Sequence, residues 1–225
     1  MTPSLLIAAL FCALGVALAL WRANQSRIKA HAAYFDAVSV LFDRVIRRIE
    51  PSGFPRLTGQ LNGQYFDVQA IPDSLSFRKL PALWVMVTLP EPMPVAATLD
   101  IMARPTGYET FSRFNTLPHA LPCPSFLPDG TGVRSDEANN VPPADLVERH
   151  SAVFADDRTK ELLIAPNGLR LVVLADEAER GRYLLFRDAE LGPTPLPAVV
   201  VHGLMVALLA LKADLSARAL TATQS

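Results

Sequence analysis

The sequence predicts an α+β protein in which an antiparallel sheet is covered by an apolar carboxyl-terminal helix and preceded by amino-terminal helices. Three observations predict this class. No charged side chain occurs from Thr2 to Trp21, the dipeptide Asn62-Gly63 separates two segments of alternating polarity, and residues 196–211 form a second apolar run. Alternation with a period of two is typical of strands and long apolar runs are typical of helices, so the chain requires both.

Residues 1–21 predict a transmembrane anchor. Twenty helical residues at about 1.5 Å each span roughly the 30 Å hydrocarbon core of a bilayer. A cleaved secretory signal is the alternative, because Ala17-Leu18-Ala19 is similar to a cleavage site. The apolar run is long, however, and neither Lys nor Arg precedes it, which favours a signal-anchor that is retained.

Basic residues follow the predicted anchor. Arg22, Arg27 and Lys29 lie within the window that sets membrane topology, and no Lys or Arg lies before the apolar run. The positive-inside rule therefore predicts a single-pass protein of the inner membrane with its main domain in the cytoplasm. We expect the same three side chains to bind anionic lipid.

A stripe of apolar residues predicts an amphipathic juxtamembrane helix over residues 22–50, ended by Pro51. The residues that recur every seven positions are Ile28, Phe35, Phe42 and Ile49. One interpretation is a coiled coil in which the 28–49 helix forms a homodimer. The other is a helix that packs on its own domain, which we favour because Leu41 and Ile46 widen the stripe.

Residues 51–225 are expected to form one α+β domain. Most of the 19 prolines lie between Pro51 and Pro143. Because proline lacks a backbone donor, this part is predicted to hold strands and loops. Asn62-Gly63 favours a type I′ turn and hence a hairpin. The strands predicted for a four-stranded antiparallel meander are Arg56–Leu61, Gln64–Ile71, Ala82–Leu89 and Ala97–Ala103.

A Pro-rich stretch at 104–147 shows no regular pattern. A structureless loop of this length is rare inside a compact domain, so the stretch either contains short elements or forms a mobile flap. Long loops often carry binding sites. The stretch is therefore the first place to look for a ligand site.

Regular patterns return after this loop. The predicted elements are a strand at Ser151–Phe154, a short helix from the Asp156-Asp157 pair through Leu163, and two antiparallel strands at Leu169–Ala175 and Tyr183–Arg187. The apolar run 196–211 is about 24 Å long as a helix, which is shorter than a bilayer. Its His202 is costly to place in lipid. We therefore favour a helix buried against the sheet, with His202 in the core, over a second membrane span.

Few residues point to catalysis or to a metal. The histidines are His31, His119, His150 and His202, and no two of them have the spacing of a metal site. Cys123 would be a thiolate nucleophile only if His119 or His150 lay within hydrogen-bond reach. We predict no catalytic, cofactor-binding or metal-binding residue and no cofactor. The net charge of −1 predicts no nucleic-acid partner.

The stretch from Val153 to Pro166 contains Phe154, an acidic pair at Asp156 and Asp157, and two leucines before a turn. It resembles a pattern in uncharacterised bacterial membrane-tethered proteins, and the apolar anchor followed by a basic segment is similar too. The resemblance implies the same overall layout, and it supplies no catalytic residue.

These observations together predict a non-enzymatic interaction or scaffolding module at the inner membrane. The alternative is a membrane-tethered hydrolase or ligand-binding domain that uses the 104–147 loop. A deep pocket that gathers Cys123 with His119 or His150 and an acidic group would favour the alternative.

Overall fold

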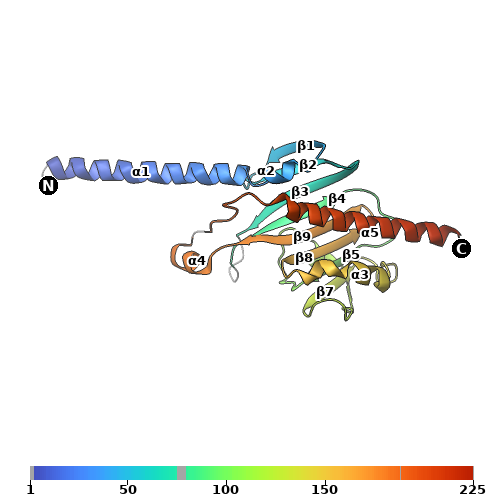
Figure 1. Cartoon of the computed structure of the whole chain (residues 1–225). Helices are drawn as coiled ribbons and strands as arrows, with labels where there is room; N and C mark the ends of the chain where they lie inside the picture. The colour runs from blue at the N-terminus through green and yellow to red at the C-terminus, as the bar shows by residue number, and fades with distance from the viewer. Residues whose placement is uncertain (1–2, 75–79, 188, 225) are drawn as a thin grey trace.

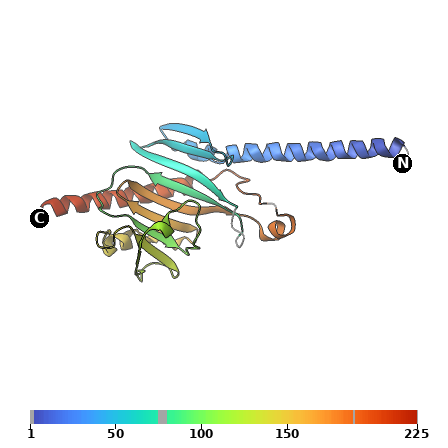
Figure 2. The ribbon, with the colours of Figure 1, turned by 180° about the vertical axis from the view of Figure 1, so that it is seen from behind.

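The structure is a computed structural model that describes residues 3–74, 80–187 and 189–224. The helices are α1 (Pro3–Ala32), α2 (Asp36–Ser39), α3 (Ala144–His150), α4 (Arg180–Phe186) and α5 (Ala198–Gln224), with 3-10 helices η1 (Phe114–Thr116) and η2 (Ser151–Ala155). The strands are β1 (Arg44–Ile49), β2 (Pro55–Leu61), β3 (Gln64–Asp73), β4 (Ala82–Leu89), β5 (Leu99–Ala103), β6 (His119–Leu121), β7 (Thr131–Ser135), β8 (Thr159–Ala165) and β9 (Gly168–Glu177). The molecule is elongated, with α1 projecting from one end and the end of α5 at the other (Figure 1 and Figure 2).

The strands form one antiparallel sheet in the order β1-β2-β3-β4-β9-β8-β5-β7-β6. The predicted α+β class is therefore confirmed. The predicted hairpin is confirmed as well, because β2 and β3 meet at Asn62 and Gly63, whose φ angles are 51° and 78°. Positive φ at both positions is what a type I′ turn requires.

The predicted meander is correct for β2, β3 and β4 and wrong for β5. Strand β5 pairs with β8 and β7, while β9 lies beside β4. The segment between β4 and β5 is therefore a connection that crosses two strands instead of a tight turn. Strand β1, on the other side of β2, completes a four-stranded meander with different members.

The predicted juxtamembrane helix over residues 22–50 is wrong beyond Ala32. Phe35 and Phe42 turn into the chain's own core, and residues 44–49 pair with β2 as strand β1. Residues 44–49 include the β-branched Val45, Ile46 and Ile49, which also suit a strand, and pairing with a neighbouring strand decides between the two structures. The described structure therefore contains no continuous helix over residues 28–49 through which the predicted homodimer could form.

The loop at 104–147 contains short elements, as one of the two alternatives predicted: η1, β6, β7 and the start of α3. Three later assignments are wrong. Ser151–Phe154 belongs to a 3-10 helix, the predicted helix through Leu163 overlaps β8, and Tyr183–Arg187 overlaps α4. Strand β8 lies between β9 and β5 and is buried on both faces, so its sequence lacks the alternation that identifies half-buried strands.

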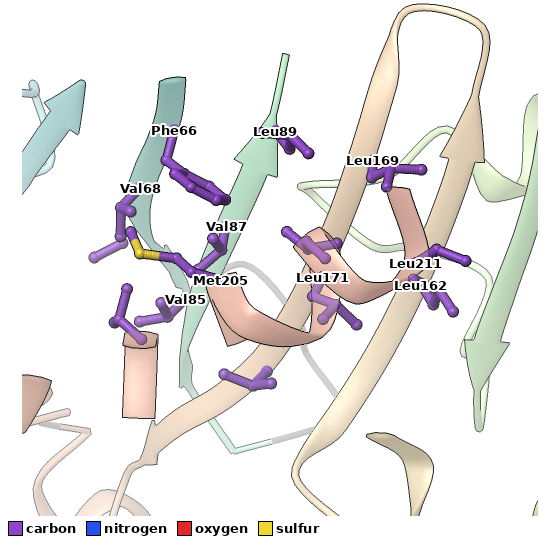
Figure 3. Close-up of a cluster of buried hydrophobic side chains, with 14 of the residues drawn as sticks. Phe66, Val68, Val85, Val87, Leu89, Leu162, Leu169, Leu171, Met205 and Leu211 are labelled. Carbon is purple, nitrogen blue, oxygen red and sulfur yellow. The ribbon is translucent and has the colours of Figure 1, made fainter. Parts of the chain in front are cut away.

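Helix α5 covers one face of the sheet, as predicted. Met205 and Leu211 lie over β3, β4, β9 and β8 in Figure 3, among side chains such as Phe66, Val87 and Leu171. Buried residues on α5 recur at helical spacing: Val201, Met205, Leu208, Leu211 and Leu215. His202 is exposed, so its predicted place in the core is wrong, because it lies outside the stripe that packs on the sheet.

Within the described part of the chain, Ala198–Thr221 of α5 has the length and apolar composition of a membrane span, with a mean hydropathy of 1.9. The same segment packs on the sheet, and core helices share this composition. Met1, Thr2 and several side chains up to Ala9 lie outside the described part of the predicted anchor. The membrane anchor at residues 1–21 stays a prediction at this point.

Candidate membrane interface

Helix α1 presents an apolar surface that no described element covers. Every side chain from Leu10 to Asn24 is exposed. The large apolar side chains among them are Leu10, Phe11, Leu14, Val16, Leu18, Leu20 and Trp21. Each would gain about 1.5–3 kcal/mol from transfer out of water. A bilayer or another apolar surface would supply that gain.

The last turn of α1 is held firmly by the sheet domain. The ring of His31 stacks on Phe54 with 4.2 Å between ring centroids, and Tyr34 packs edge-on against Phe54 at 5.4 Å. Gly192 lies beneath these rings with φ of 61°, where a Cβ atom would come within 2.8 Å of Phe54. Burial lowers the pKa of His31, partly offset by a backbone hydrogen bond with Leu191. The packing fixes the direction in which α1 leaves the domain.

A groove of about 510 Å³ lies between α1 and the segment that includes α4. From α1 it is lined by residues such as Leu20, Asn24 and Arg27, and from the other side by Arg182 and Leu191. The groove therefore places α4 beside the end of the apolar run. In Figure 1, α4 lies on the side of the domain from which α1 projects.

The basic residues predicted to bind anionic lipid lie in the same region. Arg22, Arg27 and Lys29 are all exposed on α1, between the apolar run and the packed turn at His31. At about 1.5 Å per residue, they occupy a band roughly 10 Å long beyond the apolar run. This is the place where lipid head groups would lie if the apolar run crossed a bilayer.

The residues considered for nucleophilic chemistry lie apart from an enclosed site. Cys123 is exposed, and partial burial together with the Asp129 carboxylate raises the pKa of its thiol, which disfavours the thiolate. The Nε2 of His150 lies 3.0 Å from an oxygen of Asp214 on α5. His119 is exposed on β6. The apolar cavity of about 290 Å³ beside the loop is lined by none of these three residues.

A buried acid pair is the site that sequence reasoning missed. Asp100 on β5 and Glu161 on β8 lie on the sheet face opposite α5 and are almost completely buried. The Nε of Arg170 on β9 donates to Glu161 at 2.8 Å, and the Ser112 hydroxyl donates to Asp100 at 3.4 Å. The second oxygen of each carboxyl group, Oδ1 of Asp100 and Oε1 of Glu161, has no hydrogen-bond partner within the described ranges.

The electrostatics of this pair favour a retained proton. Burial, and then the neighbouring Glu161, raise the pKa of Asp100 to about 8, against an ordinary value of 3.8. Burial likewise raises the pKa of Glu161, although Arg170 opposes the shift. A proton between two buried carboxyl groups removes the repulsion between like charges and supplies a donor. The pair is therefore expected to hold one proton at neutral pH.

The segment after β5 covers the acid pair. Phe111 packs on Trp84 with ring centroids 5.2 Å apart, and Phe114 is buried against Met102. Beside them the Lys160 ammonium donates to the carbonyl oxygens of Ala103 at 2.8 Å and of Arg104 at 2.6 Å. These contacts enclose the acid pair, so we assign it a structural role. The signal in the sequence was Asp100 itself, an acidic residue inside an apolar strand.

The described residues contain no group of three His, Cys, Asp or Glu side chains that could hold a metal ion. A cavity of about 580 Å³ lies between the start of α5 and β9, and Tyr34, Asp176 and Leu204 are among its lining residues.

Comparison with known proteins gives little further information. No known protein family matches the chain, and no curated protein is similar to it in sequence. One similar solved structure is the mycobacterial trehalose monomycolate transport factor A, TtfA, at 10% sequence identity. The similarity covers 70% of this chain and 86% of that chain, with a TM-score of 0.35. A TM-score of this size carries no argument about fold or function.

Proposed function

We propose that the protein is a membrane-anchored interaction module in which α1 crosses the inner membrane once and the sheet domain lies on its cytoplasmic side. The observation that carries this proposal is the uncovered apolar surface of α1 from Leu10 to Trp21. Residues 3–21 of the helix would span about 28 Å, close to the thickness of the hydrocarbon core. Transfer into lipid removes from water every large side chain of this surface.

The orientation rests on the basic residues at the end of the span. Arg22, Arg27 and Lys29 lie on the domain side of the apolar run, and cytoplasmic segments next to a span are rich in such residues. They lie where the phosphate groups of anionic lipids would be within reach. Anionic lipid is therefore part of the proposed interface.

The edge strand β1 is the surface that we assign to a protein partner. It is the first strand in the sheet order, and all six of its residues are exposed. Ile46 is 74% exposed and lies between Arg44 and Arg48 on one face of the strand. An edge strand presents unpaired backbone N–H and C=O groups. An extended segment of another protein can hydrogen-bond to these groups and so add a further strand to the sheet. The arginines favour an acidic extended segment.

A hydrolase or ligand-binding function of the 104–147 loop has less support. Cys123 and His119 are exposed, while His150 pairs with Asp214. The cavity beside the loop is small and apolar. No second function is proposed.

Membrane insertion and orientation can be tested with reporter fusions. We expect a reporter that is active only in the cytoplasm to be active when fused after Ser52 or after Ser225. The protein should stay in the membrane fraction in alkaline carbonate, and deletion of residues 3–21 should release it. Activity of the reporters on the outer side, or release of the full chain by carbonate, would contradict the proposal.

Partner binding can be tested by photocrosslinking in cells. A photoreactive residue at Ile46 should give a discrete crosslinked product, and the same residue at Tyr108, an exposed side chain away from β1, should not. With the photoreactive residue placed at Arg48 instead, on the same face of β1, Ile46→Asp should abolish the product without loss of the protein, because Ile46 is 74% exposed and contributes little to the core. Equal crosslinking at both positions would remove β1 as the binding surface.

A further inference from the structure

Helix α4 holds two apolar side chains in solvent. Leu184 is 57% exposed and Leu185 is 78% exposed, whereas Tyr183 on the same helix packs against the core. The helix has defined ends: the Glu179 carboxylate accepts from two backbone N–H groups of its first turn, at 2.6 and 2.8 Å, and Arg187 closes it with φ of 55°. The two leucines are thus presented by an ordered element instead of a random loop.

The position of α4 along α1 explains why such side chains are exposed. Arg182 of α4 lines the same groove as Leu20 and Asn24 of α1. Trp21 and Arg22 mark the end of the apolar run, where a bilayer would give way to head groups. Figure 1 and Figure 2 both show α4 at the side of the domain from which α1 projects.

We propose that α4 is a second membrane contact, with Leu184 and Leu185 inserted into the interfacial layer of the leaflet through which α1 leaves the bilayer. This inference rests on the proposed membrane anchor. The occupant is the lipid surface, because α4 shares a groove with the end of the proposed span through Arg182. Short apolar segments that lie in the interface bury their side chains about 5–10 Å into the boundary between head groups and acyl chains.

Apolar burial, more than charge, carries this contact. The arginines of α4 are accompanied by acidic groups: Arg182 is paired with Glu190, and Glu179 caps the helix. Insertion is therefore expected into vesicles of phosphatidylcholine as well as into vesicles that contain phosphatidylglycerol. With α1 fixed by the packing of His31 on Phe54, a second contact at α4 would also fix the rotation of the domain about α1.

The test measures the depth of single nitroxide labels on the full chain in phosphatidylcholine vesicles. Cys12 and Cys123 are replaced by Ala, and one cysteine is introduced per variant. The test position is Leu185→Cys, and Val40→Cys is the matched control, because Val40 is also 78% exposed but lies on the sheet domain beyond the end of α1. Leu14→Cys reports on α1.

We expect the label at position 185 to collide with oxygen, which concentrates in lipid, severalfold more often than with an aqueous nickel complex. The label at position 40 should show the reverse preference. A lipid signal at Leu14→Cys together with an aqueous signal at Leu185→Cys would overturn the second contact and leave the anchor in place. An aqueous signal at Leu14→Cys would overturn the anchor itself. Adding Leu184→Asp to Leu185→Cys should shift the label toward water, and an unchanged signal would count against insertion.

Discussion

Replacement of Asp100 by Asn tests whether the buried acid pair holds a proton in the folded protein. The folded-state pKa of Asp100 is about 8, against 3.8 for the ordinary group, so the folded state binds this proton more tightly than the unfolded state. Its contribution to stability is fully present below the unfolded pKa and is lost as the pH rises through the folded pKa. The free energy of unfolding should therefore fall between about pH 4 and pH 8 and then level off.

The slope has a physical upper limit. One proton that is bound only in the folded state changes the free energy of unfolding by about 1.4 kcal/mol per pH unit. The amide introduced by Asp100→Asn keeps the shape of the side chain and an oxygen for the Ser112 hydroxyl, and it carries no proton to lose. Relative to the natural chain, Asp100→Asn should gain up to about 4 kcal/mol between pH 5 and pH 8. The favourable interaction of Arg170 with Glu161 is kept in both proteins.

The assay is thermal or denaturant unfolding of the full chain in detergent micelles at several pH values, followed by tryptophan fluorescence. Trp84 packs on Phe111 directly beside the acid pair, so its emission reports on this part of the fold. Asp129→Asn, at an exposed carboxylate, is the matched control and should leave the pH dependence unchanged. Equal pH slopes for the natural chain and Asp100→Asn would refute the shared proton. Loss of stability in Asp100→Asn at every pH would refute it as well.

Further substitutions test the close packing of the sheet and the role of α5, each by the change in the free energy of unfolding. Gly59→Ala should destabilise the protein by more than about 2 kcal/mol, because the new Cβ atom would lie 2.5 Å from the Arg44 carbonyl oxygen. At Gly203 on α5 a Cβ atom meets open space, so Gly203→Ala should stabilise the protein by up to about 1 kcal/mol. Met205→Ala should cost about 2–5 kcal/mol, while exposed Val206→Ala should cost well under half of that. Equal costs at positions 205 and 206 would contradict the packing of α5 on the sheet.

Local patterns were sufficient where an element carries its own signal. The Asn62-Gly63 turn specifies its hairpin, because few dipeptides accept positive φ at both positions. The alternation of apolar and polar residues around Phe66 and Val68 also identifies β3, since one face of the strand packs in the core and the other is more accessible to solvent. The packing of α5 on the sheet was predicted correctly, but from an apolar run of residues 196–211, whereas the helix has 27 residues and His202 lies on its exposed side.

The errors fall on elements whose structure depends on distant partners. Residues 44–49 become a strand because β2 offers hydrogen bonds, and nothing within the segment distinguishes this from a helix. β8 is buried on both faces and lacks alternation, and the Asp156-Asp157 pair before it suggested a capped helix instead. The acid pair depends on Asp100 and Glu161, which lie far apart in the chain and come together only because β5 and β8 are neighbours in the sheet.

The two apolar helices have similar composition and opposite environments in this fold. The apolar face of helix α5 packs on the sheet. The carboxyl terminus of α5 lies at the side of the molecule opposite to α1 (Figure 1). If α5 stays packed in this way, it cannot share a bilayer with the apolar run of α1, because its chain direction leads away from that run. Both helices have an apolar composition, but the apolar face of α5 is covered by the sheet, whereas the large apolar side chains of α1 from Leu10 to Trp21 are exposed. The packing of α5 and the exposure of α1 therefore support the proposal that α1, and not α5, is the membrane helix.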